Sequence, residues 1–155
     1  MNLHPHAALR NGAHHYPLRV YYEDTDAAGV VYHATYLRFA ERARTEALRD
    51  LGVPHNEMTS QHGLMFMVRR VKVDYLDSAL LDDSLCVITQ PFTIRAASVE
   101  LNQRVVRIGE PERILAGLDV WLACIRLADQ RPARLPARWR DALSSMVQPA
   151  PDGAH

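Results

Sequence analysis

The residues best suited to chemistry lie in one stretch, residues 21–44, which reads YYEDTDAAGVVYHATYLRFAERAR. A strand-like segment ends there, an acidic loop with Gly29 follows, and a helical pattern begins. The first N–H groups of a helix have no partner inside it, and the helix dipole favours negative charge at that end. Such an end can stabilise an oxyanion that develops on a carbonyl. Asp26 lies a few residues upstream, and a carboxylate beside an oxyanion site is the minimum apparatus for acyl transfer to water.

Acidic residues in such a loop also have a structural interpretation. Asp24 and Asp26 could cap a turn or the start of the helix, and we favour that role for Asp24. His33 could cap or pack, but its unperturbed pKa of about 6.5 also makes it a plausible proton carrier. The thiolate of a thioester is a good leaving group, so hydrolysis of a thioester would need no strong general acid.

The elements that position these residues are predicted from the spacing of apolar side chains. Leu18, Val20 and Tyr22 alternate with polar neighbours, which is typical of a strand. A helical pattern runs from about residue 34 to residue 51. Its apolar stripe consists of mostly small residues: Tyr36, Ala40, Ala43, Ala47 and Leu51. Gly52 and Pro54 follow and are placed to end the helix.

The rest of the chain is rich in predicted strands, over residues 71–75, 84–94, 97–108 and 113–127, with a short closing helix over 136–146. Consecutive strands with short connections favour an antiparallel sheet. The predicted fold class is therefore α+β, with one long helix packed against an antiparallel sheet of about five strands. We expect one domain over residues 16–147, between a flexible N-terminal arm, residues 1–15, and a flexible C-terminal tail, residues 148–155.

Composition excludes several classes of protein. The chain has 155 residues, 48% hydrophobic and 23% charged, which is typical of a globular domain. Its 18 basic residues balance 18 acidic ones, so charge gives no support for nucleic-acid binding.

Cys86 and Cys124 are expected to be buried free thiols. No zinc-spaced Cys/His set, P-loop or dinucleotide fingerprint occurs, so we expect no metal and no cofactor. Without a signal peptide or a long apolar run, no transmembrane segment and a cytoplasmic location are expected.

The loop and the helix start closely resemble the 4-hydroxybenzoyl-CoA thioesterase-like branch of the hotdog superfamily. Within that branch they look most like the acyl-CoA thioesterases associated with the Tol–Pal system of Gram-negative bacteria. The resemblance rests on the pattern Y-x-D-T-D-x-x-G-V-V-Y-H-x-x-Y, which starts here at Tyr22. It continues more loosely through ERARTEALRDLG, VKVDYLDSALLDD and RLP, and so touches most of residues 16–140. Ala28 stands where family members often carry a second glycine, which predicts a slightly stiffer loop.

This resemblance implies an acyl-CoA thioesterase of the hotdog fold, with roles for particular residues. Asp26 corresponds to the family's catalytic carboxylate, which acts as nucleophile or general base. Tyr22 and His33 stand where the family places supporting polar groups, and the backbone N–H groups near Tyr32 and His33 would polarise the thioester carbonyl. The family also implies a homodimer or homotetramer with active sites at subunit interfaces, and a possible peripheral association with the cell envelope machinery.

Other interpretations stay open. Glu41 is a rival carboxylate, since another hotdog branch uses a helical glutamate. It lies 8 residues beyond His33, about 12 Å along the helix, so it cannot easily share the helix-end site within one subunit. A hotdog dehydratase would need a different His–Asp arrangement. A catalytically silent acyl-binding or scaffold protein is the third alternative.

The substrate contacts are the least specific prediction. Arg69, Arg70 and Lys72 are expected to meet the phosphates of CoA, with a solvated strand face as the alternative. Met58, Met65, Phe66 and Met67 are expected to line either the core or an acyl pocket. Short aliphatic, long aliphatic and aromatic acyl groups all remain open.

Overall fold

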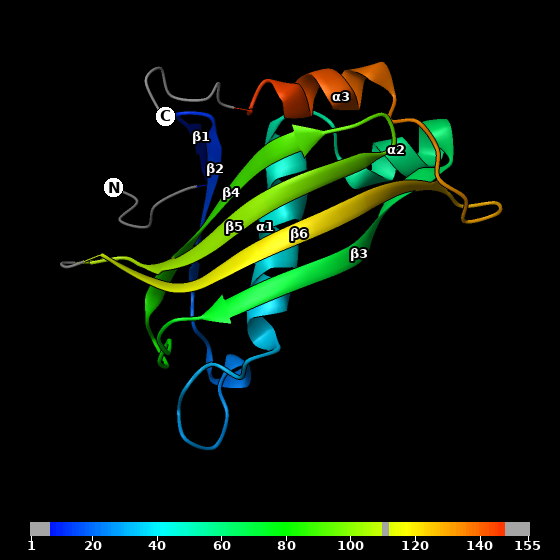
Figure 1. The fold of residues 1–155 in the computed structure, drawn as a ribbon. Coiled ribbons are helices and arrows are strands. Elements are labelled where there is room, and N and C mark those ends of the chain that lie inside the picture. The colour runs from blue at the N-terminus through cyan, green and yellow to red at the C-terminus, as the bar shows by residue number, and fades with distance from the viewer. Residues whose placement is uncertain (1–6, 110–111, 148–155) are drawn as a thin grey trace, which may run out of the picture.

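A computed structural model describes residues 7–109 and 112–147 of the chain. Its framework is one curved antiparallel sheet, whose strands follow the spatial order β1-β2-β4-β5-β6-β3 (Figure 1). The strands are β1 (Ala8–Arg10), β2 (Ala13–Arg19), β3 (Leu64–Tyr75), β4 (Ser84–Ile94), β5 (Ser98–Arg107) and β6 (Arg113–Arg126). The α+β class is confirmed, and the described sheet has six strands where about five were predicted.

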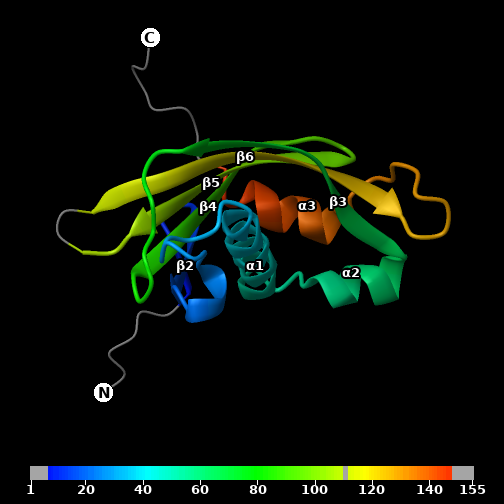
Figure 2. The same ribbon diagram turned by 90° about the horizontal axis from the view of Figure 1, so that it is seen from below.

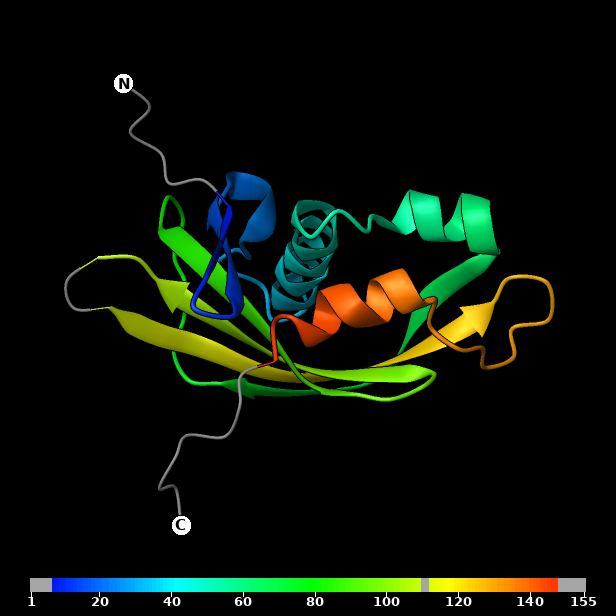
Figure 3. The same ribbon diagram turned by 90° about the horizontal axis from the view of Figure 1, so that it is seen from above.

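The helices all lie on the concave face of this sheet, as Figures 2 and 3 show from two opposite sides. They are α1 (Thr35–Asp50), α2 (His55–His62) and α3 (Ala137–Ser144), and a short 3-10 turn, η1 (Tyr22–Asp24), precedes them. Figure 2 shows the sheet arching over α1, which confirms one long helix wrapped by an antiparallel sheet. None of the helices in the described residues is long and apolar enough to cross a membrane.

The long helix packs closely because the side chains on its inner stripe are mostly small. Ala40 and Ala43 are fully buried, and Tyr36, Phe39 and Ala47 are also buried on that stripe. All of these except Ala47 meet the apolar inner side chains of the sheet in one core. Small residues at these positions let the helix backbone approach the sheet, so the sequence fixes both the position and the rotation of α1.

The N-terminal region differs from the predicted flexible arm. Residues 8–15 form β1 and the start of β2, joined at Asn11 and Gly12, which both have positive φ. Two such residues make the tight turn of a hairpin, and Asn-Gly is its strongest local signal. The His14 side chain is fully buried, and its Nε2 lies 2.7 Å from Asp50 Oδ2 at the end of α1. This hairpin therefore belongs to the folded domain, whereas residues 1–6 and 148–155 lie outside the described part.

Two further elements differ from the sequence prediction. Strand β3 spans Leu64–Tyr75, much longer than the predicted 71–75, and it has a bulge between Val68 and Arg70. Helix α2 was not predicted, because Met58 is its only buried residue and no apolar period marks it. Within the described sheet, β3 pairs only with β6, so its other side is a free edge.

Candidate functional site

The acidic loop is held in place by the segment that follows β3. Val31 N–H donates to Ala79 O at 2.9 Å, and Leu81 N–H donates to Gly29 O at 3.3 Å. Val30 and Leu80 form an isolated β-bridge between the same two segments. The second half of the loop is therefore held by this segment, although the loop projects beyond the end of the sheet at the base of Figure 1.

Asp26 lies at the start of the tight turn in this loop. Its Oδ1 accepts the Ala28 N–H at 2.8 Å and the Val30 N–H at 3.4 Å, while its own N–H donates to Val30 O at 2.9 Å. Gly29 completes the turn with φ at +81°, a conformation that favours glycine. Among the described residues, Asp26 Oδ2 has no hydrogen-bond partner, and the side chain is exposed. One carboxylate oxygen is therefore held by the loop backbone, and the other has no partner within the described residues.

The two aspartates of the motif have different surroundings. Asp24 is buried, and its Oδ2 accepts the Tyr21 N–H at 2.8 Å. Its backbone carbonyl also accepts the Tyr32 N–H at 3.1 Å. Asp24 therefore closes the η1 turn, which confirms the structural role that the sequence favoured for it.

The expected oxyanion donors are not equivalent. The Tyr32 N–H is already bonded to Asp24 O, so it is not free in this structure. The His33 N–H makes no hydrogen bond within the described residues, and it lies just before the start of α1 at Thr35. Of the two predicted groups, only the His33 amide is available, and it stands where the helix dipole favours negative charge.

Aromatic side chains fix this end of the helix. The buried Tyr36 Oη accepts the Ala79 N–H at 3.0 Å, which ties α1 to the segment that supports the loop. Tyr75 Oη donates to His33 O at 2.8 Å, and the Tyr75 ring packs edge-on against the Tyr36 ring at 5.5 Å. The sequence analysis did not identify Tyr75 as part of the site, because it is remote in the chain and follows an ordinary strand pattern.

The predicted supporting side chains point to different surroundings. The His33 ring packs against Tyr32 at 4.4 Å and is exposed, and no hydrogen bond joins it to Asp26 among the described residues. The Tyr22 side chain is 84% exposed, because residue 22 falls in η1 and not in the predicted strand. Within one chain, the structure therefore gives neither side chain a contact to the Asp26 carboxylate.

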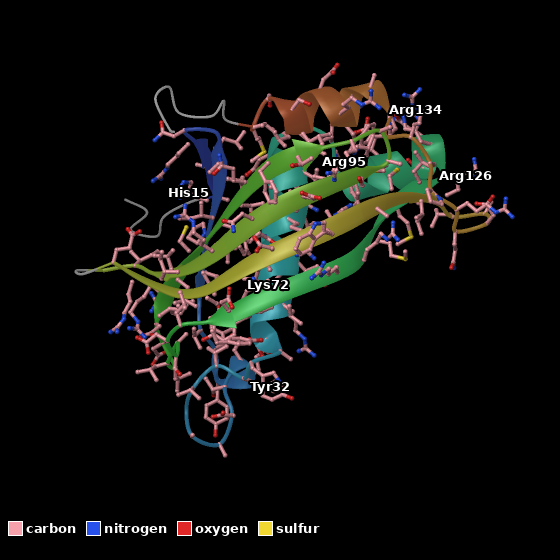
Figure 4. The ribbon with its side chains drawn as sticks, viewed as in Figure 1. His15, Tyr32, Lys72, Arg95, Arg126 and Arg134 are labelled. Atoms are coloured by element: carbon pink, nitrogen blue, oxygen red, sulfur yellow. The ribbon has the colours of Figure 1, made fainter. Side chains whose placement is uncertain are left out.

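The predicted CoA contacts lie on the other side of the sheet. Val71 and Val73 pack into the core on the concave side, so Arg70 and Lys72, which alternate with them, face the convex side. The Arg70 guanidinium lies 4.9 Å from the centre of the Trp121 ring, and Arg69 falls at the bulge. In Figure 4, Lys72 is labelled on β3, and Tyr32 is labelled on the loop below that strand. Within one chain these basic groups are separate from the Asp26 loop.

A hollow lies on the concave side of the sheet, between the helices and the sheet. It has a volume of about 210 Å³ and is lined from α1 to α3 by both polar and apolar side chains. Glu41, the rival carboxylate, is on its wall together with Phe66, so Phe66 lines a pocket as well as the core edge. No cluster of His, Cys, Asp and Glu in the described residues could hold a metal ion.

Known proteins share this sequence and fold. The family model of the thioesterase-like superfamily matches residues 20–143. An acyl-CoA thioesterase, YbgC of Haemophilus influenzae, is 42% identical over 121 residues, which cover 78% of this chain and 87% of that protein. YbgC of Helicobacter pylori strain J99 is 33% identical, over 83% of this chain and 98% of that protein. The crystal structure of a probable thioesterase from Bartonella henselae superposes with a TM-score of 0.74 at 35% identity, over 80% of this chain and 99% of that one.

Proposed function

Since this chain belongs to the thioesterase-like superfamily and is a thioester hydrolase, we propose that it hydrolyses an acyl-CoA to the free acid and CoA. The observation that carries the proposal is the Asp26 carboxylate, whose Oδ1 is held by backbone N–H groups of the loop and whose Oδ2 has no hydrogen-bond partner within the described residues. The same loop leads to the His33 N–H, which is unpaired just before the start of α1. A carboxylate oxygen and a helix-end amide are the two groups that attack on a thioester carbonyl would use.

The reaction has two routes that use the same oxygen. As general base, Asp26 Oδ2 takes a proton from water, and the hydroxide adds to the thioester carbonyl. As nucleophile, Oδ2 adds to the carbonyl itself and forms a mixed anhydride, which water then cleaves. In both routes the tetrahedral oxyanion collapses, the C–S bond breaks, and CoA leaves as a thiolate that is protonated on release. The His33 N–H is the proposed donor to the oxyanion, and the exposed His33 ring and Tyr22 hydroxyl are proposed to contact the bound substrate.

We propose further that the working enzyme is a homodimer joined along β3, or a homotetramer made of two such dimers. This strand is 12 residues long and leaves a free edge, and Met65, Met67 and Val68 on it are each about two-fifths exposed. A long apolar edge strand is a template for pairing with another chain. Two copies of β3 related by a twofold axis through one continuous sheet would run antiparallel.

Such pairing would complete the site. The end of β3 is tied to the catalytic loop through the bond from Tyr75 to His33. The beginning of β3 carries Phe66 and Val68, which line the concave pocket. Antiparallel pairing would set the end of one β3 beside the beginning of the other. The Asp26 loop of one subunit would then lie near the pocket of its partner, so each active site would use both chains.

Binding of the nucleotide is proposed for the basic groups of β3. Arg69, Arg70 and Lys72 lie on or next to the convex face, where they can reach CoA phosphates only from a site that extends around the sheet or belongs to a neighbouring subunit. A cytoplasmic location and peripheral association with the cell envelope machinery remain predictions, and fractionation of the source cells would test both.

One experiment separates the proposed activity from its rivals. The purified protein is incubated with a panel of saturated, 3-hydroxyacyl and aromatic acyl-CoA thioesters, and free thiol is measured together with product mass. Release of CoA with formation of the acid supports hydrolysis. Formation of an alkene thioester without free thiol would instead identify a dehydratase, and tight binding without turnover would identify a silent acyl-binding protein.

A further inference from the structure

The concave pocket combines apolar walls with polar and charged side chains. Its apolar lining includes Leu48, Val99, Leu122 and Leu143, from α1, β5, β6 and α3. Its polar lining includes Glu41, Arg44, His55 and Thr89. With a volume of about 210 Å³, the pocket has room for a short acyl chain.

Buried polar groups hold the Arg44 side chain in this pocket. Its Nη1 donates to Gln103 Oε1 at 2.9 Å. Gln103 is fully buried, and its Nε2 donates to Ala40 O and to Thr89 Oγ1, both at 2.9 Å. Because every partner in this chain of bonds is itself fixed, the guanidinium is oriented before any ligand arrives.

No carboxylate is paired with the remaining donors of Arg44 within the described residues. Within the described part of the chain, no carboxylate oxygen lies within ion-pair distance of Arg44, and its Nε and Nη2 make no hydrogen bond. Burial lowers the pKa of Arg44 from its ordinary value, and nearby Glu41 opposes this only in part. Desolvating a charge is unfavourable unless an opposite charge or further hydrogen bonds compensate it.

Two other titratable side chains, Glu41 and His55, line the pocket with Arg44. Glu41 is exposed to solvent and lies one turn of α1 before Arg44. Burial lowers the pKa of His55, and the charges of Arg44 and Arg49 lower it further, while Glu41 raises it in part; the net shift favours the neutral ring. Arg44 is the one arginine or lysine among the side chains that line this pocket.

We infer that this pocket binds the acyl portion of the substrate and that Arg44 recognises a carboxylate at the far end of the acyl chain. The substrate class is then a monothioester of a short dicarboxylic acid with CoA. The apolar walls contact the methylene groups, and the free guanidinium donors pair with the terminal carboxylate in the geometry that arginine favours. This inference rests on the proposed acyl-CoA hydrolysis, and it makes Arg44 a specificity-determining residue.

The test compares glutaryl-CoA with pentanoyl-CoA, which share a five-carbon acyl group and differ in a terminal carboxylate or methyl. Wild-type kcat/KM is expected to be higher for glutaryl-CoA. Arg44→Gln should lower kcat/KM for glutaryl-CoA by about 10-fold to 100-fold, the usual effect of losing hydrogen bonds to a charged group. The same variant should change pentanoyl-CoA turnover by less than about threefold. Arg44→Lys keeps the charge and should retain part of the preference.

The control is Arg42→Gln, an exposed arginine on the same helix that does not line the pocket, and it should leave the ratio of the two substrates unchanged. Equal losses of kcat/KM on both substrates in Arg44→Gln, or a wild-type preference for pentanoyl-CoA, would overturn the inference. Arg44 would then have only a structural role, through its hydrogen bond to Gln103. Melting temperatures are measured for all variants, and Arg44→Lys decides the question if Arg44→Gln does not fold.

Failure of the proposed acyl-CoA hydrolysis would give a different result from failure of the Arg44 inference. If wild type releases CoA from no thioester, the hydrolysis proposal fails, and binding decides the role of Arg44. Non-hydrolysable thioether analogues of the two substrates are then titrated by calorimetry. Tighter binding of the carboxylate analogue, lost in Arg44→Gln, supports the inference, and equal binding of the two analogues refutes it.

Discussion

Replacing Asp26 with asparagine should separate catalysis from loop structure. In Asp26→Asn, the amide oxygen can still accept the Ala28 N–H and the Val30 N–H, which Oδ1 accepts at 2.8 and 3.4 Å. The loop geometry should survive, so we expect a change in unfolding free energy below about 1 kcal/mol. The charged Oδ2, however, is lost. Since general-base catalysis is worth about 10²–10⁴-fold, kcat should fall by at least about 100-fold.

The assay follows thiol release at saturating acyl-CoA, with KM and melting temperature measured on the same preparations. KM should change little, because the helix end and the substrate contacts are intact. The matched control is Asp24→Asn: its carboxylate accepts only the Tyr21 N–H among described groups, which an amide oxygen can also do, so it should lose much less activity. Near-normal turnover of Asp26→Asn, or a loss of activity that follows its melting, would show that Asp26 is a turn residue.

The same variant tests whether each site uses two chains. Asp26→Asn keeps an open pocket, and Thr45→Trp, at a half-buried pocket position on α1, keeps the carboxylate but fills the pocket. Each homodimer should be inactive. Random mixing makes half of the dimers mixed, and each mixed dimer regains one of its two sites, so activity should return to about a quarter of wild type. Mixtures that stay inactive would place Asp26 and the pocket of one chain in the same site.

Three further predictions follow from the fold. His14→Ala removes a fully buried side chain and its bond to the α1 terminus, so it should lower the unfolding free energy by about 2–4 kcal/mol in urea titrations, and an unchanged midpoint would contradict docking of the hairpin. Met67→Lys on the β3 edge should shift light scattering toward monomer and reduce turnover, whereas Leu9→Lys on the opposite edge strand should do neither. KM for acyl-CoA should rise with salt more than KM for a thioester without the nucleotide, because salt screens charge contacts and the Debye length is about 3 Å at 1 M. Lys72→Gln should reduce this dependence of KM on salt. Equal salt responses of the two substrates would exclude the basic contacts.

The elements with a clear apolar period were predictable from the sequence. The stripe from Tyr36 to Ala47 predicted α1 to within one residue at each end, because a helix that covers a sheet must bury one continuous face. The three long strands β4, β5 and β6 were found for a similar reason, since alternation is enforced wherever one face of a strand is buried.

The misplaced segments lack that constraint. Residues 1–15 are rich in His, Asn and Gly, so composition predicted an arm, while the Asn11-Gly12 turn was the signal for a hairpin. The burial of His14 depends on Asp50, 36 residues away, and no local pattern reports such a partner. Strand β3 was cut short because the bulge after Val68 interrupts its alternation; Arg70 and Lys72, which follow the bulge, face the convex side.

The candidate site shows a similar division between local and distant information. The loop of Asp26 could be predicted because its turn, its glycine and the helix start are contiguous in the chain. The pocket could not, since its walls come from α1, α2, α3 and four strands that meet only after folding.

The positions of these two parts also carry a functional consequence. Thr35 begins α1 beside the loop, and Arg44 lies nine residues further on, about 13 Å along the helix. In the proposed mechanism the acyl carbon contacts Asp26 while the rest of a short acyl group occupies the pocket, and within one subunit these two places lie further apart than such an acyl group spans. The proposed antiparallel pairing of two β3 strands removes that separation, because it sets the end of one strand beside the beginning of the other. The proposal therefore makes the free edge of β3 a requirement for catalysis as well as for assembly, and it predicts that dissociating the dimer abolishes turnover even when both monomers stay folded.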